Sequence, residues 1–242
     1  MSRTVPSASP TRPPSEPAPR GALQAVLFDM DGLLVDTEPL WFEVESTVMA
    51  RLGGAWDSAD QEELVGGSLE RTLDYLLARA SCPQSRETVA RWMVGGMVEL
   101  LDRRPIATLP GALELLAEVA AAGVPYALVT SSERVIMEAV LRQLKVTFPV
   151  TVCGEDVAAT KPSPEPYLLA AARLGADPRR CAALEDSPNG VAAAQAAGCL
   201  TVAVPNLLPI PAARGRVVVA SLAEVTLAGL AGWVAARCGQ AS

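Results

Sequence analysis

The sequence predicts an α/β fold, in which a Rossmann-like parallel sheet core is covered by helices and carries a small all-helical cap after its first strand. Two observations lead to this prediction. Short apolar runs alternate with Ala/Leu-rich helical patterns over most of the chain, as in parallel sheets that are covered on both faces. Residues 39–104 break this alternation, because they show helical patterns and no convincing strand.

Short apolar runs mark the strands of the predicted sheet. Five of them are interpreted as buried strands: Gln24–Phe28, Tyr126–Thr130, Val150–Cys153, Ala182–Leu184 and Leu200–Val204. Helical patterns lie between most of these runs, at Ala112–Ala122, Glu133–Leu144, Pro166–Leu174 and Val191–Ala197. Val217–Val219 is expected to add an edge strand and Leu222–Arg237 a closing helix. Because such sheets bind ligands at the carboxyl ends of their strands, the residues that follow each run are candidates for a site.

Residues 39–104, which break the alternation of strands and helices, are interpreted as a cap. Its helical patterns are Leu40–Leu52, Leu69–Ala80 and Glu87–Leu101. Since the insert follows the first strand, we expect it to lie over that strand's carboxyl end, as a lid that excludes water and selects substrate. The predicted division is a catalytic core at residues 23–38 and 105–242, a cap at 39–104, and a disordered tail at 1–22, which is rich in Pro, Ser, Ala and Arg.

The composition excludes several classes of protein. The 242-residue chain has a net charge of −7 and no basic run, which argues against nucleic acid and anionic membranes as partners. It contains no histidine, so histidine-dependent zinc sites and Ser-His-Asp triads are excluded. Its five scattered cysteines lack CxxC spacing, which favours reduced thiols and a cytoplasmic protein. No apolar run approaches the roughly 20 residues that cross a bilayer, and we expect a monomer.

Two aspartates follow the first apolar run, in the segment Phe28-Asp29-Met30-Asp31-Gly32. Two carboxylates at the end of a buried strand repel each other and are costly to bury without a partner. A divalent cation is the simplest partner that keeps both ionised. The glycine behind them lets the chain turn sharply away. Taken alone, the pair also fits a strand-to-turn junction that is capped by two solvated aspartates.

Three further polar clusters follow later runs in chain order: Thr130-Ser131-Ser132, Lys161 and Glu185-Asp186. Each cluster has a structural alternative when it is taken by itself. The hydroxyl cluster fits a helix cap, the lysine fits a solvated loop cation, and the acidic pair fits a helix start that the helix dipole favours. The joint pattern is more specific, because all the clusters lie at strand ends in one order.

Each of these residue types can take part in phosphoryl transfer. Asp29, ionised at neutral pH, can attack phosphorus, and Asp31 can protonate the leaving oxygen and later deprotonate water. A hard cation, expected to be Mg²⁺, can take oxygen ligands from the Asp29 and Asp186 carboxylates and the Asp31 carbonyl. Lys161 can offset negative charge in the transition state. The Thr130 hydroxyl and the amides at a helix N-terminus can bind phosphate oxygens.

The same residues resemble the four motifs of the haloacid dehalogenase superfamily. The matching segments are Phe28–Glu38 (FDMDGLLVDTE), Thr130–Ser132, Lys161–Pro162 and Leu184–Ser187, and the resemblance covers about residues 24–220. Within the superfamily, the chain resembles the branch whose helical cap follows the first motif. This branch contains β-phosphoglucomutase and the hexose- and hexitol-phosphate phosphatases. This resemblance implies a Mg²⁺-dependent phosphatase that acts on a small phosphorylated metabolite, a sugar or polyol phosphate, through an aspartyl-phosphate intermediate.

The resemblance also implies roles for individual residues. Asp29 is the nucleophile and Asp31 is the acid/base. The phosphoryl group is contacted by the hydroxyl cluster Thr130, Ser131 and Ser132 and by Lys161. Magnesium binds at Asp29, Asp31 and Asp186, and Glu185 is either a ligand through water or an anchor behind the site. The Asp two positions after Asp29 favours phosphatase or mutase chemistry over dehalogenase chemistry.

A β-phosphoglucomutase-like phosphomutase is the alternative enzyme, and two departures weaken it. The mutase has a histidine in its first cap helix, where this chain has Leu40-Trp41-Phe42, and an arginine in its cap loop, where this chain has Leu69. A binding module that has lost turnover is a third alternative, but it would have no need of an acid/base. Four insert residues are candidates to contact the leaving group: Trp41, Glu45, Ser68 and Arg71. Trp41 equally fits an apolar core position of the cap.

Overall fold

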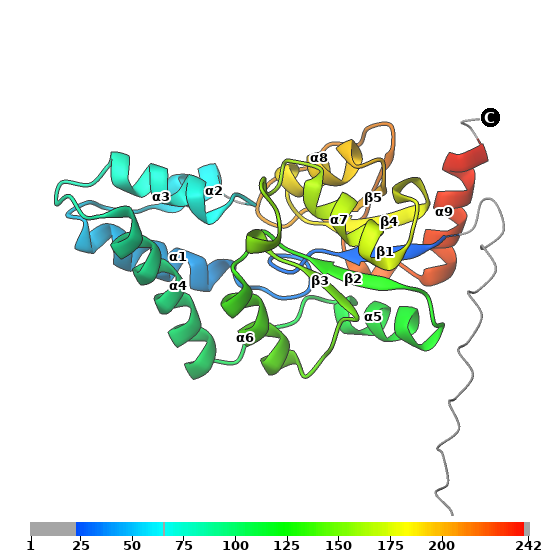
Figure 1. Ribbon diagram of the computed structural model, residues 1–242, viewed down its shortest axis with the longest axis horizontal. Coiled ribbons are helices and arrows are strands. Elements are labelled where there is room, and N and C mark those ends of the chain that lie inside the picture. Colours follow the sequence, from blue (N-terminus) through cyan, green and yellow to red (C-terminus); the bar gives the residue numbers. More distant parts are fainter. Residues whose placement is uncertain (1–22, 65, 240–242) are drawn as a thin grey trace, which may run out of the picture.

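The computed structural model describes residues 23–64 and 66–239, so the predicted tail at residues 1–22 lies outside the described residues. The described residues form a six-stranded parallel sheet with the strand order β3-β2-β1-β4-β5-β6 (Figure 1). Its strands are β1 (Ala25–Phe28), β2 (Tyr126–Val129), β3 (Val150–Val152), β4 (Cys181–Glu185), β5 (Leu200–Ala203) and β6 (Arg216–Val218). The predicted α/β fold is confirmed, and the expected edge strand corresponds to β6.

Helices cover both faces of this sheet. One face packs against α5 (Ala112–Ala121), α6 (Arg134–Leu144) and α9 (Leu227–Gly239), and the other against α7 (Glu165–Leu174) and α8 (Pro188–Ala196) (Figure 1). Along β1, Val26 and Phe28 face the first group, whereas Ala25 and Leu27 face the second. Because both faces are buried, the strand is an unbroken apolar run and not an alternating one.

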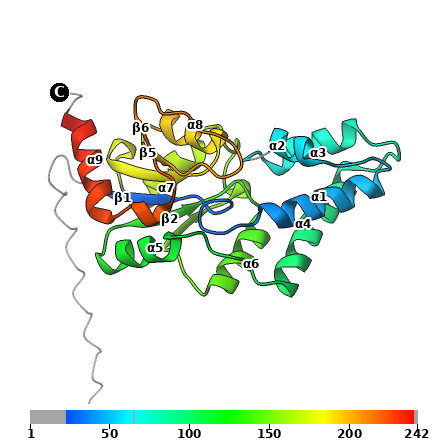
Figure 2. The same ribbon diagram turned by 180° about the vertical axis from the view of Figure 1, so that it is seen from behind.

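The segment between β1 and α5 is helical. Its helices are α1 (Glu38–Arg51), α2 (Ser58–Leu64), α3 (Leu69–Ala78) and α4 (Arg86–Arg103), which extend from one end of the sheet (Figures 1 and 2). The sequence predicted α1, α3 and α4 and missed α2, whose seven residues are mostly polar. We call this helical segment the cap, and its boundaries at residues 39 and 104 stay a prediction.

The cap is attached to the core through α4, which packs on α6. The side chain of Gln143 on α6 strengthens this contact. Its amide nitrogen donates to the carbonyl oxygen of Arg104 at 2.9 Å, and its amide oxygen accepts from the backbone N–H of Ile106 at 3.0 Å. Both partners lie where the chain leaves the cap, so this amide fixes the return path of the backbone to the core.

The predicted closing helix at Leu222–Arg237 is corrected by the structure. A short 3₁₀ helix occupies Leu222–Glu224, and α9 begins only at Leu227. Two hydroxyl residues cause the break, because each caps a different segment. The Ser221 hydroxyl accepts from the backbone N–H of Ala223, and the Thr226 hydroxyl accepts from that of Gly229, both at 3.1 Å.

Candidate active site

The residues predicted from strand ends meet at one edge of the sheet. Asp29 follows β1, Thr130 follows β2, and Asp186 follows β4, while Lys161 reaches the same edge from the loop before α7. A cavity of about 90 Å³ lies among them, and its core-side lining consists of Asp29, Asp31, Thr130, Ser131, Ser132, Lys161, Asp186 and Ser187. Glu185, at the end of β4, lies next to this lining and contacts Lys161.

Lys161 links two buried carboxylates. Its ammonium lies 2.5 Å from Asp29 Oδ1 and 2.7 Å from Glu185 Oε1, and it donates to the backbone oxygen of Val129 at 2.9 Å. The Tyr167 hydroxyl also donates to Glu185 Oε1. Burial lowers the pKa of Lys161, but Asp29 and Glu185 together raise it above its ordinary value, so the side chain stays charged. These contacts fix the position of Asp29 at the cavity.

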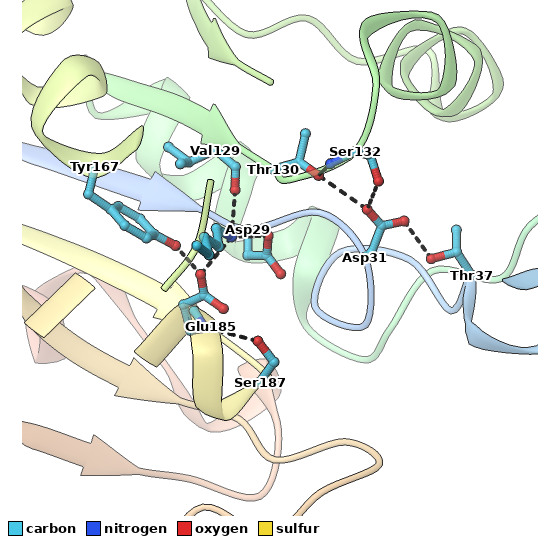
Figure 3. A network of polar contacts seen from close by, with 11 residues as sticks. Asp29, Asp31, Thr37, Val129, Thr130, Ser132, Tyr167, Glu185 and Ser187 are labelled. Atoms are coloured by element: carbon cyan, nitrogen blue, oxygen red, sulfur yellow. Dashed lines mark hydrogen bonds and ion pairs between the residues drawn. The ribbon is translucent and has the colours of Figure 1, made fainter. Parts of the chain in front are cut away.

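Three hydroxyl groups hold the Asp31 carboxylate. Thr37 donates to Oδ1 at 2.6 Å, while Ser132 at 2.7 Å and Thr130 at 3.2 Å donate to Oδ2 (Figure 3). The Thr130 hydroxyl in turn accepts from the backbone N–H of Ser132 at 3.0 Å. Asp31 is thereby oriented toward the cavity by two residues that follow β2 and by one at the start of the cap. Thr37 was not predicted as a site residue, although it lies in the first motif.

Two glycines let the chain pass close to the carboxylates. Gly32 has a φ of +75°, and a Cβ there would lie 2.1 Å from Asp186 Oδ2. A Cβ on Gly190 would lie 1.8 Å from Glu185 Oε2. The sharp turn predicted at Gly32 is therefore present. The requirement for glycine at position 190 was not predicted, since it depends on where the Glu185 side chain lies.

The buried acidic groups are suited to a divalent cation. Asp29, Glu185 and Asp186 each offer a carboxylate oxygen, and these atoms lie within 4.8 Å of one another. Burial, then Glu185, raises the pKa of Asp29 to about 7, and burial, then Asp29, raises the pKa of Asp186 well above its ordinary value. Glu185 Oε2 is buried without a hydrogen-bond partner among the described residues. Three carboxylates against one ammonium leave an excess of two negative charges, which a dication would neutralise.

The cap supplies the other side of the cavity. Its lining there consists of Glu38, Trp41, Glu45, Gln61, Leu64, Gly66, Gly67, Ser68, Leu69, Thr72 and Met93. Three of the four candidates for leaving-group contact, Trp41, Glu45 and Ser68, are among them. The fourth, Arg71, lies outside this cavity, lines an adjoining cleft of about 450 Å³, and forms an ion pair with Glu63 at 2.8 Å.

The cap loop touches the core directly at this cavity. Gly66 has a φ of +65°, and a Cβ there would lie 2.4 Å from the Ser187 hydroxyl, just beyond β4. Ser187 also caps α8, because its hydroxyl accepts from the backbone N–H of Gly190 at 3.1 Å. Gly66 and Gly67 therefore lie at the cavity against the core, and the role of the insert as a lid stays a prediction.

Two glutamates of the cap have raised pKa values. Burial, and next the charge of Glu38, raises the pKa of Glu45 to about 8, although the Trp56 side chain lowers it. Burial, and next Asp31, raises the pKa of Glu38 to about 7. Both shifts show that the cap side of the cavity favours the neutral form of these carboxyl groups.

Glu45 is expected to make the free energy of unfolding fall as the pH rises. Its pKa is about 8 when folded and 4.5 ordinarily, so the folded chain holds the proton more tightly. Stability is therefore lost between these two pKa values, by at most about 1.4 kcal/mol per pH unit, and the loss levels off above them. Glu45→Gln lacks this titration. Thermal unfolding of both proteins from about pH 5 to 9 should show the variant gaining relative stability up to about pH 8. A constant difference would contradict the shift.

The parallel sheet, the helical insert and the carboxylate-lined cavity together define a class of protein, namely an α/β enzyme with a site built from aspartates at the carboxyl edge of its sheet. Residues 26–204 match the family model described as haloacid dehalogenase-like hydrolase. The chain belongs to this family. The predicted membership and the prediction of a hydrolytic enzyme are thus confirmed.

The relatives include several phosphatases. Hexitol phosphatase B of Escherichia coli is 38% identical over 194 residues, which are 77% of this chain and 85% of the relative. A probable pseudouridine-5'-phosphatase of Drosophila melanogaster is 35% identical over 208 residues, which are 82% and 89% of the two chains. CbbY from Rhodobacter sphaeroides, solved with phosphate, is 32% identical with a TM-score of 0.79 over 86% of this chain and 99% of that one. A mutant of the same CbbY was solved with xylulose-1,5-bisphosphate.

Proposed function

We propose that the chain is a Mg²⁺-dependent phosphatase that hydrolyses a small phosphorylated metabolite, a sugar or polyol phosphate, through an aspartyl-phosphate intermediate. The observation that carries this proposal is a pair of aspartates at one cavity: Asp29 is buried beside Lys161, and Asp31 is oriented by three hydroxyl groups. One carboxylate can therefore act as a nucleophile while the other moves protons. The relatives named as hexitol and pseudouridine-5'-phosphatases support a phosphate monoester as substrate.

The groups around Asp29 suit a phosphoryl group. The Ser131 hydroxyl lines the cavity and is buried without a hydrogen-bond partner among the described residues, so it is available to a phosphate oxygen. Thr130 and Ser132 line the same side, and Lys161 brings a positive charge. Donors that are fixed before the substrate arrives stabilise the charge of the transition state without reorganisation.

The carboxylates of Asp29 and Asp186 and the backbone carbonyl of Asp31 would hold the metal. Glu185 would contact it through a water or act as the anchor of Lys161. When bound there, Mg²⁺ supplies positive charge that offsets the carboxylates and the phosphoryl oxygens.

The two aspartates divide the reaction between them. In the first step an Asp29 carboxylate oxygen bonds to phosphorus, the bond from phosphorus to the leaving oxygen breaks, and Asp31 donates its proton to that oxygen. In the second step Asp31 takes a proton from water, and the water oxygen bonds to phosphorus. The bond between phosphorus and Asp29 then breaks, which releases inorganic phosphate and restores the Asp29 carboxylate.

Release of inorganic phosphate from a panel of sugar, polyol and nucleotide monophosphates tests the proposal. With Mg²⁺ present, we expect release from one class of compound by the native protein and none by Asp29→Asn. No release from any compound would count against a phosphatase. Net isomerisation of glucose-1-phosphate with little free phosphate would favour the phosphomutase alternative instead.

Removal of divalent metal is expected to abolish turnover, and added Mg²⁺ to restore it. The reason is the excess of negative charge that Lys161 leaves uncompensated among Asp29, Glu185 and Asp186. Mg²⁺ should also raise the Tm, because a ligand that binds only the folded chain stabilises it. Phosphate release and thermal unfolding are measured in EDTA, with EDTA already saturated by Mg²⁺ as the control. Full activity after metal removal would rule out the metal site.

The remaining predictions concern location and assembly. No helix of residues 23–64 and 66–239 combines the length and apolar character that crossing a membrane requires. The five cysteines are free thiols, which supports a reducing compartment. The cytoplasmic location and the monomeric state stay predictions, as does the absence of nucleic-acid and membrane partners.

A further inference from the structure

Among the described residues, the cap side of the cavity carries acidic groups but no basic one. Lys161, on the core side, is the only basic side chain among the described residues that line the cavity. It is already engaged by Asp29, Glu185 and the backbone oxygen of Val129. The part of a substrate that leaves with its oxygen would face Glu38 and Glu45 without a cation to pair with.

Of these two glutamates, Glu45 has the unsatisfied oxygen. Its side chain is buried, with the residue 6% exposed, and Oε2 has no hydrogen-bond partner among the described residues. Glu38 is bonded by Gln61, whose amide nitrogen lies 3.2 Å from Glu38 Oε2 and 3.0 Å from the Glu38 backbone oxygen. A buried acceptor without a donor is costly, and a hydroxyl group of a bound ligand would remove that cost.

The charge of the leaving group decides whether it can bind beside Glu45. A second phosphate or a carboxylate would place negative charge beside Glu38 and Glu45. The raised pKa values of these two residues show that their surroundings favour neutral groups. The hydroxyl groups of a neutral sugar or polyol can instead donate to the glutamate oxygens. A site that leaves the charge of the wrong ligand unpaired gains specificity in this way.

We propose that Glu45 determines specificity by hydrogen bonding to an uncharged, hydroxyl-bearing leaving group, on a side of the cavity where no described side chain offers a cation to an anionic one. The inference rests on the proposed function and narrows its substrate to monophosphates of neutral sugars and polyols. Bisphosphates and phosphorylated acids are excluded. This chain would therefore differ in selectivity from CbbY, whose solved complex contains a bisphosphate.

Comparison of kcat/KM for sorbitol-6-phosphate and xylulose-1,5-bisphosphate tests this inference with Mg²⁺ present. We expect the native protein to prefer the monophosphate by about 100-fold or more, because burying a second phosphate without a cation to pair with it is strongly unfavourable. In Glu45→Leu the kcat/KM for sorbitol-6-phosphate should fall by about tenfold, since a hydrogen bond to the leaving group is lost. The kcat/KM for the bisphosphate should change little, so that the preference shrinks.

Glu62→Leu is the matched control. Glu62 lies on α2 of the cap, is exposed and does not line the cavity, so the same substitution should leave the preference as in the native protein. Glu45→Leu keeps roughly the volume of the side chain and removes an oxygen that has no partner among the described residues, so its Tm should not fall. Calorimetric binding of both ligands to Asp29→Asn, with and without Glu45→Leu, repeats the comparison without turnover.

The possible outcomes distinguish a wrong inference about Glu45 from a wrong proposed function. Equal kcat/KM values or equal binding of the two ligands by the native protein would overturn the inference, as would an unchanged preference in Glu45→Leu. Failure of the proposed function would show differently. No phosphate would then be released from p-nitrophenyl phosphate, which has neither hydroxyl groups nor a second charge in its leaving group, while the binding comparison would still test Glu45.

Discussion

Asp29→Asn is expected to reduce kcat by a factor on the order of 10⁴ or more and to leave the fold intact. An amide cannot form the bond to phosphorus that the carboxylate forms. The side chain keeps its size, and Lys161 retains Glu185 as a partner at 2.7 Å. Because burial and Glu185 already raise the pKa of Asp29 to about 7, the loss of its charge should not lower the Tm. Turnover of p-nitrophenyl phosphate and thermal unfolding measure the two effects.

Asp102→Asn is the matched control for this substitution. Asp102 lies on α4, is exposed and lies away from the cavity, so the same chemical change should leave kcat at the native value. Residual turnover of Asp29→Asn within about tenfold of the native protein would refute the assignment of Asp29 as nucleophile.

Lys161→Met should cost both stability and activity. The ammonium pairs with both Asp29 and Glu185, and removal of one partner from a buried ion pair typically costs about 3–5 kcal/mol of folding free energy. Loss of a positive charge beside the transferring phosphoryl group should lower kcat by about 10²- to 10³-fold. Denaturant unfolding with and without Mg²⁺ measures the first effect. The destabilisation should be smaller with Mg²⁺, because the metal also supplies positive charge to Asp29.

Lys145→Met provides the comparison for Lys161. Lys145 is exposed at the end of α6 with a φ of +55°, a conformation that Lys and Met adopt at similar cost. The control should therefore stay within about 0.5 kcal/mol of the native stability. Lys161→Met with native stability and native kcat would show that the buried network does not support the site.

The strands could be predicted because their burial leaves a clear pattern. A strand covered on both faces must be apolar at every position, and the four residues of β1 are all buried. Helix α2 has no such pattern, because only Asp60 and Leu64 of its seven residues are buried. Its position depends on side-chain contacts from α3, where the Tyr75 hydroxyl donates to Asp60 at 2.8 Å. Contacts of this kind cannot be inferred from periodicity.

The site residues that directly follow a strand could be predicted from the sequence. Asp29, Thr130 and Asp186 had to meet, because β1, β2 and β4 are parallel neighbours in the sheet. Their supporting partners could not be found in this way. Tyr167, which bonds Glu185, fits the apolar face of α7, and Thr37 fits the start of a cap helix. Neither contact follows from periodicity or from the position of a strand end, so only the folded arrangement reveals them.

The most direct test of the central claim is detection of a phosphoryl group on Asp29 during turnover. Asp31→Asn should cleave p-nitrophenyl phosphate, whose leaving group needs little help from an acid, and should then hydrolyse the aspartyl-phosphate slowly because no base activates water. Acid quenching and peptide mass spectrometry, with Mg²⁺ present, are expected to find the phosphoryl group on the peptide that contains Asp29 and to lose it after hydroxylamine treatment. Phosphate release by this variant with a phosphoryl group on another residue, or with none on Asp29 at any time, would contradict the account.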